Sequence, residues 1–405
     1  MRKYEVKIEE LYEAYYDCRR RKRNKPSALA FEMHYESELH RLHEELETGR
    51  YEIGRSVCFC VTRPKLREVF AASFRDRVVH HLLMRKISKL VESQMIDDSY
   101  SCRVRKGTDY GVMRIAEKMR RASENYTREA WVMKCDLSGF FMSIDKERLW
   151  QMLRTLIERG YTDEDKDFVL WLTHMIVMHR PEQRCEIHGD TGLFAMLPDN
   201  KTLFRSNGKG MPIGNLTSQI FGNYYLSGFD KWMMHRLGDG YGRYVDDFVC
   251  IHRDKKYLLS LLGDVRRYLR EELGLTLHPS KVYLQDVRKG VKFTGQMIKP
   301  NRIYVGNRTV NNAFNAISRY EGGDIDRLLT LTNCYAGFMR GKKAAYDIRH
   351  KLLTIAWRKS EGMAYADMHW RKLVIKKRYN ERILRRRAIR NERRNKKIWA
   401  ETVRT

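Results

Sequence analysis

Apolar residues recur at helical spacing through much of the chain, and they alternate with polar residues in a few short stretches. Helical spacing predicts amphipathic helices, whereas strict alternation predicts half-buried strands. Strands or hairpins are expected at residues 51–70, 131–136, 242–251, 275–277 and 290–295. The helices expected from the pattern lie at 5–18, 27–49, 76–93, 145–158, 220–237 and 254–273, with a small helical domain at 308–356.

The stretch 242–251 carries two adjacent carboxylates at a tight turn between two expected strands. Asp246 and Asp247 precede the compact apolar run 249–251, which is typical of a buried strand. Neighbouring strand residues point to opposite faces, so the two carboxylates cannot both be ordinary surface charges. One role for such a pair is to hold divalent cations, which prefer oxygen ligands. The alternative is the turn of a plain hairpin.

A third acidic residue ends another apolar strand. Asp136 closes the run that begins at Trp131, and Ser138 and Gly139 then allow a sharp bend before two aromatic residues. An Asp at the end of a strand, with a backbone carbonyl beside it, is a candidate third metal ligand. The alternative is a structural Asp that caps the bend.

The net charge indicates the kind of partner. The 405 residues include 79 Lys and Arg against 51 Asp and Glu, a formal net charge of +28. A chain of this length can bury a sizeable core, and we expect two or three lobes. The positive excess is too large for a typical cytosolic small-molecule enzyme and indicates a polyanion. No apolar run approaches the roughly 18 residues that span a bilayer, so nucleic acid is favoured over a membrane.

Cysteine usage and the N-terminus bear on the cellular setting. The eight cysteines are scattered and show no paired framework, so reduced thiols are expected. The first ten residues are charged throughout and show no secretory signal. We therefore expect a cytoplasmic protein.

Basic clusters and a polar insertion complete the pattern. Residues 19–23 form a basic cluster that either contacts phosphates or is a solvated loop. Residues 371–397 form a basic tail with high helix propensity, and its charge favours RNA or an acidic protein as a partner. Residues 179–209 are polar and are expected to be an inserted loop.

Several motifs occur together in the order and spacing of reverse transcriptases, which the chain resembles over about residues 50–350. Arg67 and the stretch 74–79 resemble motifs of the fingers. Five further segments resemble successive motifs of the palm. They are the strand ending at Asp136, the Pro-Ile-Gly…Ser-Gln turn at 212–219, the Tyr-Val-Asp-Asp hairpin at 244–247, the His-Pro-Ser-Lys turn at 278–281 and the Lys-Phe-Thr-Gly hairpin at 292–295. The resemblance implies an α+β, right-hand polymerase fold with fingers, a palm made of an antiparallel sheet with packed helices, and a helical thumb.

The resemblance also implies a division of the chain. We expect an N-terminal helical extension at 1–50, fingers at 51–130, a palm at 131–300, a thumb at 301–360 and a basic tail at 361–405. The palm would contain the inserted loop at about 179–209, with part of the fingers interleaved.

One departure narrows the family. Most reverse transcriptases carry Gln-Gly-x-x-x-Ser-Pro in the palm's template-proximal turn, whereas this chain has Ile213 for the Gln and Gln219 for the Pro. The variant resembles reverse transcriptases of diversity-generating retroelements. These enzymes copy a template-repeat RNA into cDNA with frequent errors opposite template adenines, and the altered cDNA replaces a variable region of a target gene. The resemblance further implies a small, basic, ring-forming accessory variability determinant as a partner.

The motif matches imply roles for single residues. Asp136, Asp246 and Asp247 would be catalytic and, with the Leu137 carbonyl, would hold two Mg²⁺ ions, with Mn²⁺ as an alternative. Two such cations stabilise the entering and leaving oxygens of an in-line displacement, which is what nucleotidyl transfer to a primer requires.

The remaining roles concern the incoming dNTP and the RNA/cDNA duplex. Arg67 and Lys65 would hold the triphosphate. Phe141 would exclude a 2′-hydroxyl, or it is a core aromatic. Lys281 would protonate the leaving pyrophosphate, or it is a surface lysine. The incoming nucleotide would be contacted by Ile213 and Gly214. Copying fidelity would depend on Ile213, Ser218 and Gln219. The primer end would be supported by Phe293 and Gly295. An apolar Ile213 removes a polar contact, and a lost hydrogen bond weakens selectivity by about 1–3 kcal/mol.

Two alternatives remain open. The chain either belongs to another reverse-transcriptase class, such as a group II intron or phage-defence enzyme, or is a non-catalytic RNA-binding scaffold with a degenerate polymerase fold. The intact Asp136, Asp246 and Asp247 argue against the scaffold. A template and variable repeat pair in the flanking DNA would separate the enzyme classes.

Overall fold

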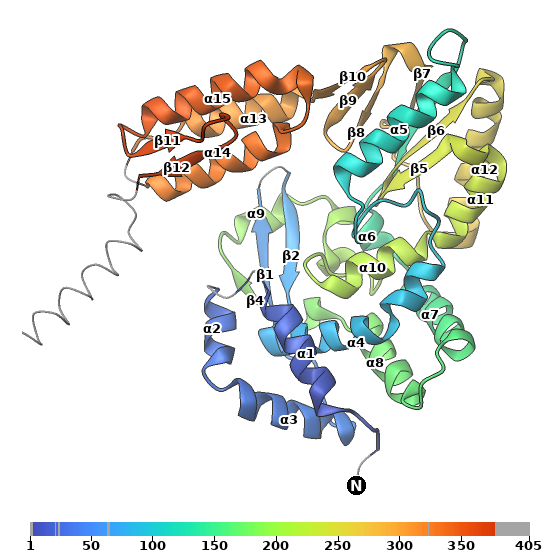
Figure 1. Ribbon diagram of the computed structural model, residues 1–405. Coiled ribbons are helices and arrows are strands. Elements are labelled where there is room, and N and C mark those ends of the chain that lie inside the picture. Colours follow the sequence, from blue (N-terminus) through green and yellow to red (C-terminus); the bar gives the residue numbers. More distant parts are fainter. Residues whose placement is uncertain (1–2, 21, 23–24, 63–64, 323, 377–405) are drawn as a thin grey trace, which may run out of the picture. The chain divides into compact units, whose positions relative to one another are not determined.

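The computed structural model of the chain divides into two compact units, Met1–Val287 and Arg288–Thr405. It describes residues 3–20, 22, 25–62, 65–322 and 324–376 (Figure 1). Helices and strands occur largely in separate runs in both units, and the sheets are largely antiparallel, so the α+β class predicted from the sequence is confirmed.

An antiparallel sheet in the order β5-β6-β3-β7 is the centre of the first unit. Phe248 on β6 packs against Phe229 of α11, with ring centroids 5.4 Å apart, while Gly242 on β5 faces Ile115 of α5. Helices therefore cover both faces of the sheet, which explains why β6 reads as a continuous apolar run rather than an alternating one. The elements are β3 (Trp131–Asp136), β5 (Tyr241–Tyr244), β6 (Asp247–His252), β7 (Tyr283–Asp286), α5 (Thr108–Ala122), α11 (Ser227–Leu237) and α12 (Lys255–Leu273).

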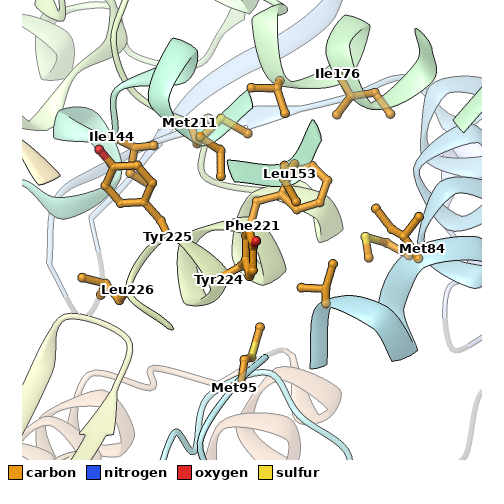
Figure 2. Close-up of a cluster of buried hydrophobic side chains, with 14 of the residues drawn as sticks. Met84, Met95, Ile144, Leu153, Ile176, Met211, Phe221, Tyr224, Tyr225 and Leu226 are labelled. Carbon is orange, nitrogen blue, oxygen red and sulfur yellow. The ribbon is translucent and has the colours of Figure 1, made fainter. Parts of the chain in front are cut away.

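A layer of helices beside this sheet contains the largest part of the core. Helix α4 packs against α1, α7, α8 and α10, and Figure 2 shows side chains from several of these helices meeting around Phe221 and Tyr224 of α10. Most residues of helix α10 are buried among its neighbours, including the polar Thr217, Ser218 and Asn223. The bounds are α1 (Ile8–Arg19), α4 (Phe74–Ser93), α7 (Lys146–Gly160), α8 (Lys166–Met178) and α10 (Leu216–Tyr225).

Two of the predicted helices are each divided in the structure. The predicted helix 27–49 is α2 (Pro26–Glu32) followed by α3 (Tyr35–Glu47), and the predicted helix 220–237 spans the end of α10 and all of α11. His34 interrupts the first at φ −134° and ψ 25°, outside the helical region. Apolar periodicity continues across such a break, so it does not reveal the break.

The predicted hairpin 51–70 is present and gains a third strand. Strand β1 (Ser56–Val61) pairs antiparallel with β2 (Arg67–Ala71) and parallel with β4 (Cys185–His188). β4 lies in the stretch predicted to be an inserted loop, together with the short helix α9 (Gly192–Ala195), so the expectation of a plain loop is wrong. The parallel partner of a strand lies far away in sequence, so the local residue pattern of the short, exposed β4 does not predict its pairing with β1.

The second unit contains a small sheet and a helical domain. The sheet order is β10-β9-β8, and β11 pairs with β12 as a hairpin. The predicted basic helix at 371–397 is wrong at its start, where β12 lies, and its part beyond Lys376 is outside the described residues. The bounds are β8 (Val291–Phe293), β9 (Gln296–Lys299), β10 (Arg302–Val305), α13 (Asn307–Ser318), α14 (Ile325–Met339), α15 (Tyr346–Lys359), β11 (Ala364–Ala366) and β12 (Leu373–Ile375).

The short helix α6 (Phe140–Ser143) lies between β3 and α7 in the chain. Within the described ranges, none of the helices has the combination of length and apolar character needed to cross a membrane.

Candidate active site

The two adjacent carboxylates lie at the turn between β5 and β6. Tyr244 pairs with Asp247, so Val245 and Asp246 form a two-residue turn, as the sequence predicted. Val245 has φ 56°, a left-handed conformation that is uncommon for a β-branched residue. Surrounding contacts must therefore stabilise the turn.

Arg243 supplies one of those contacts. Its Nη1 donates a 2.8 Å hydrogen bond to the Val245 carbonyl, while its Nε and Nη2 donate to the two carboxylate oxygens of Asp230 at 2.7 and 2.6 Å. Both side chains are fully buried, so this is a bidentate ion pair inside the protein. Sequence reasoning missed this pair, although an Asp within the apolar stretch 220–237 was a signal that it needs a buried partner.

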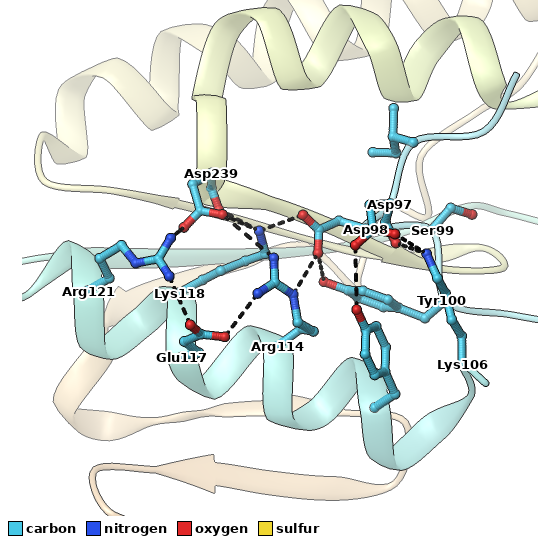
Figure 3. A network of polar contacts seen from close by, with 12 residues as sticks. Asp97, Asp98, Ser99, Tyr100, Lys106, Arg114, Glu117, Lys118, Arg121 and Asp239 are labelled. Atoms are coloured by element: carbon cyan, nitrogen blue, oxygen red, sulfur yellow. Dashed lines mark hydrogen bonds and ion pairs between the residues drawn. The ribbon is translucent and has the colours of Figure 1, made fainter. Parts of the chain in front are cut away.

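The segment before α5 also supports β5. The backbone N–H of Arg243 donates to the Asp98 carbonyl at 2.9 Å, and that of Tyr100 donates back to Arg243 at 3.0 Å. Figure 3 shows the adjoining network, in which the buried Lys118 ammonium lies 2.7 Å from both Asp98 and Asp239. The hairpin is thereby joined to α5 and to the residues that precede β5.

Strand β3 places the third aspartate beside the turn. Asp136 is in register with Asp247 on the neighbouring strand, and the Leu137 N–H donates to the Asp246 carbonyl at 3.1 Å. The Asp136 carbonyl accepts from the His278 N–H at 2.7 Å. The structure thus brings Asp136, Leu137, Asp246 and Asp247 together at one end of the sheet. The strand predicted at 275–277 is reduced to a single bridge between Leu277 and Leu137.

The three carboxylates influence one another electrostatically. Burial raises the pKa of Asp246 to about 6, and the negative charges of Asp136 and Asp247 contribute to the increase. Burial also raises the pKa of Asp247, although Lys134, whose Nζ lies 3.0 Å from its carboxylate, opposes this increase. Lys281 forms an ion pair with Asp136. Asp136 and Asp247 therefore each have a lysine partner.

The carboxylate and carbonyl oxygens gathered here are suitable ligands for a divalent cation. Within the part of the chain that the structure describes, no three His, Cys, Asp or Glu side chains surround a common point as a metal cluster. Three carboxylates nevertheless lie together here, with Asp136 buried and Asp246 and Asp247 half-buried. Burial and the two neighbouring negative charges raise the pKa of Asp246, and a bound cation would lower it again. Oxygen ligands of this kind are those that Mg²⁺ and Mn²⁺ prefer.

Arg67 and Lys65 lie toward the tip of the β1–β2 hairpin. Both side chains are exposed, and Arg67 is the first residue of β2. The positive charge of Arg67 lowers the pKa of Asp246, so the guanidinium lies within electrostatic reach of the aspartates. Lys65 is exposed and lies two residues before the start of β2.

Phe141 lies in α6, directly after the bend at Gly139. Gly139 has φ 56°, so the glycine permits the sharp bend that the sequence predicted. The half-buried Phe141 ring packs close to Gly222 of α10, where an added Cβ would lie 3.1 Å from the ring. Packing against α10 therefore restricts the position of this ring.

The turn that contains Ile213 and Gly214 lies against β2. The Phe70 N–H donates to the Ile213 carbonyl at 2.8 Å. Gly214 has φ 131°, and a Cβ there would lie 2.5 Å from the Phe70 carbonyl oxygen, so only glycine fits. The close approach that requires glycine here is thus made by the neighbouring strand β2, and a contact of Gly214 with the nucleotide stays a prediction.

Ser218 and Gln219 lie in the first turn of α10. Gln219 is exposed, and its Oε1 accepts from Cys102 Sγ at 3.2 Å. Ser218 is buried, and its hydroxyl has no hydrogen-bond partner among the described residues. The helix begins at Leu216, so both residues lie within it.

Phe293 and Gly295 belong to the second unit. Phe293 is fully buried at the end of β8, and Gly295 takes φ 80° in the turn to β9. The predicted hairpin is therefore present, and its link to a primer end stays a prediction.

Comparisons with known proteins agree with this geometry. Residues 63–298 match the family model described as reverse transcriptase (RNA-dependent DNA polymerase). Protein YkfC of Escherichia coli (strain K12) is 24% identical over 308 residues, which cover 67% of this chain and 74% of YkfC.

Among solved structures, the fold is similar to apo telomerase from Candida tropicalis, with a TM-score of 0.50 and 10% identity over 76% of this chain. Telomerase from Candida albicans, solved with a fragment of telomeric RNA, aligns with a TM-score of 0.45 and 12% identity over 82% of this chain. The present chain covers 57% and 58% of these two telomerase chains.

The right-hand polymerase fold expected from the sequence is confirmed by the likeness to the Candida tropicalis enzyme. The family model matches more than half of the chain and includes Asp136, Asp246 and Asp247. The chain therefore belongs to the reverse transcriptase (RNA-dependent DNA polymerase) family.

Proposed function

We propose that this chain extends a DNA primer on an RNA template by nucleotidyl transfer at Asp136, Asp246 and Asp247. The observation that carries the proposal is the pairing of Asp136 with Asp247 across β3 and β6, with Asp246 in the adjoining turn. This places three carboxylates at one end of neighbouring strands in a chain with a net charge of +28. A basic protein with a carboxylate cluster suits a polyanionic substrate and the cations that neutralise it.

Two Mg²⁺ or Mn²⁺ ions would be held by the three aspartates and the Leu137 carbonyl. When bound, such ions stabilise the entering and leaving oxygens of an in-line phosphoryl displacement. The chain's own contribution is to fix the carboxylates. The bidentate pair of Arg243 with Asp230 stabilises the turn, and the N–H of Leu137 holds the Asp246 carbonyl.

The surrounding residues would orient the dNTP. Arg67, with Lys65 as a second cation, would bind the triphosphate, because exposed basic groups near the carboxylates form charge-assisted hydrogen bonds with phosphate. Lys281, already beside Asp136, would donate a proton to the pyrophosphate oxygen as it leaves. Phe141 would exclude a ribose 2′-hydroxyl, and Phe293 and Gly295 would support the primer end.

Replacement of a catalytic carboxylate tests this proposal. We expect Asp136→Asn and Asp246→Asn each to abolish primer extension on an RNA template, because the amide keeps the shape and removes the charge. RNA affinity, measured by fluorescence anisotropy, should stay unchanged. Asp264→Asn on the exposed surface of α12 is the matched control and should extend normally. Normal extension by either active-site variant would refute the assignment.

We infer further that the enzyme belongs to a diversity-generating retroelement and copies a template-repeat RNA with errors at adenines. Support comes from Ile213 and Gln219, which replace the Gln and Pro of other reverse transcriptases. Ile213 lies next to the β2 strand that begins at Arg67, so its apolar side chain belongs to the surroundings of the proposed nucleotide site. Its partners would include the RNA/cDNA duplex and a ring-forming accessory variability determinant.

An exchange at position 213 tests the retroelement assignment. We expect Ile213→Gln to reduce misincorporation opposite template adenine, since an amide adds a polar contact worth about 1–3 kcal/mol of discrimination. The measurement is the error spectrum of cDNA made on one RNA template by both proteins. Ile213→Leu keeps an apolar side chain of similar volume and should retain the wild-type spectrum. An unchanged error rate at adenine in Ile213→Gln would contradict the role.

We also propose the assignment of the chain to an extension at 1–50, fingers at 51–130, palm at 131–300, thumb at 301–360 and tail at 361–405. The helices of the second unit support a helical thumb, and the β5-β6-β3-β7 sheet supports a palm.

A further inference from the structure

A short part of the inserted region contacts two parts of the proposed nucleotide site. Residues 199–203, which we call the linking segment, lie within the stretch 179–209 whose role the family motifs do not explain. The segment touches β2 on one side and the bend after β3 on the other. All of these residues belong to the first unit.

The contact with the bend is a close approach of backbones. Asn200 Nδ2 donates to Ser138 Oγ at 3.0 Å. A Cβ on Gly139 would lie 2.4 Å from the Asn200 carbonyl oxygen, so the linking segment occupies the space where any other residue would place its side chain. Because Gly139 also has φ 56°, the bend and the segment fit each other only with glycine here.

The contact with β2 is made through a buried carboxylate. Glu68 is fully buried, and it accepts hydrogen bonds from Thr202 Oγ1 at 2.6 Å and from the Leu203 N–H at 2.8 Å. A buried carboxylate is costly unless donors satisfy it, so these bonds tie the segment to the strand. Thr202 is itself almost completely buried.

The two contacts lie next to residues with proposed roles in nucleotide binding. Glu68 directly follows Arg67, the proposed triphosphate ligand. Ser138 and Gly139 lie between Asp136 and Phe141, the proposed carboxylate and sugar contacts. The linking segment therefore contacts both the strand that begins at Arg67 and the bend that precedes Phe141.

We propose that the linking segment is a positioning element of the nucleotide site and that Asn200 sets the bend that carries Phe141. Its ligand class is the deoxynucleoside triphosphate, and its effect is selection of a deoxyribose over a ribose. The proposal rests on the polymerase function proposed above. Asn200 acts through the bend and is a positioning residue.

Removal of the Asn200–Ser138 hydrogen bond from each side tests the proposal. For Asn200→Ala and Ser138→Ala we expect a roughly 3- to 10-fold increase in KM for dNTP, the effect of one lost hydrogen bond, with kcat changed less than about 2-fold. The preference for dNTP over rNTP should fall by a similar factor. The double variant should be no worse than either single variant, because both remove the same bond.

The controls separate positioning from a general loss of structure. His188→Ala, on the half-exposed side chain of β4 in the same inserted region, should keep the wild-type KM and sugar preference. RNA affinity and the thermal midpoint are measured for every variant. If Asn200→Ala fails to fold, Ser138→Ala carries the test from the other side.

The outcomes distinguish this proposal from the function on which it rests. If the wild-type chain extends a primer while both alanine variants keep its KM and sugar preference, the positioning role is refuted and the polymerase function stands. A fall in kcat alone, with KM and sugar preference unchanged, would indicate a merely structural segment and also refute the role. A wild-type chain that extends no primer would refute both.

Discussion

His80 shows how a single buried side chain changes the response of the protein to pH. It lies on α4, almost completely buried, with Nδ1 2.8 Å from Thr217 Oγ1 of α10. Burial lowers the pKa of His80 to about 3, and the nearby positive charges of His179, His81 and Arg77 act in the same direction. The folded protein therefore keeps this imidazole neutral at pH values where a histidine in the unfolded chain is protonated.

This shift predicts a loss of stability in mild acid. Below the unfolded pKa of about 6.5, the unfolded chain binds a proton that folded His80 does not, so stability falls as the pH decreases toward about 3. Between about pH 7 and 5 the wild-type protein should lose about 2 kcal/mol that His80→Gln retains, because glutamine does not titrate. Urea denaturation at the two pH values measures the difference.

The two proteins share every other titrating group, so the difference between their pH dependences isolates position 80. An equal loss of stability in wild type and His80→Gln would contradict the prediction.

At the scale of elements, the β5–β6 hairpin depends on contacts made well outside it. Arg243 is buried beneath the turn and pairs with Asp230 on α11, and Tyr241 donates a 2.7 Å hydrogen bond to the same carboxylate. Local pattern predicted the hairpin and its tip correctly, since both follow from residues adjacent in sequence. The pattern did not reveal the ion pair, which requires α11 to pack behind the sheet.

Removal of one member of this pair should be costly. Arg243→Met leaves the Asp230 carboxylate buried without its partner, and we expect a loss of about 3–5 kcal/mol in the free energy of unfolding. The double variant Arg243→Met/Asp230→Leu removes both charges and should recover a large part of that loss. Chemical denaturation of the single and double variants measures both effects.

A surface pair provides the comparison. Arg267 pairs with Asp264 on the exposed side of α12, and Arg267→Ala should change stability by less than about 1 kcal/mol. A similarly small effect of Arg243→Met would show that the buried pair does not stabilise the hairpin.

At the scale of the whole molecule, charge is the dominant property. The excess of Lys and Arg gives +28, and many of these residues, such as Arg67 and Lys281, are exposed. Binding of RNA by such a protein releases counterions, so its affinity should depend steeply on salt.

We expect at least about four phosphate contacts, which corresponds to a slope near −3 for log K against log salt with single-stranded RNA. The affinity should then fall by roughly 50-fold between about 100 and 400 mM salt. Fluorescence anisotropy with a labelled RNA measures this, and an uncharged solute of equal osmolarity is the control. A slope shallower than about −1 would contradict a binding mode based on phosphate contacts.

Local sequence was sufficient for the features that depend on neighbouring residues. The apolar run behind Asp246 and Asp247, the strand ending at Asp136 and the glycine bend after it all follow from backbone preferences and side-chain alternation. The order of these motifs was also sufficient to identify the family, because a polymerase site needs its carboxylates at the ends of neighbouring strands.

Other features arise only when distant segments meet. Arg243 and Asp230, Glu68 and Thr202, and Asn200 and Ser138 are partners through packing, and no local pattern identifies the partner of each residue. The same holds for β4, whose parallel pairing with β1 converts an expected loop into part of a sheet. Burial and hydrogen bonding between segments far apart in sequence are properties of the folded chain, and they determine how the aspartates and their surroundings are held.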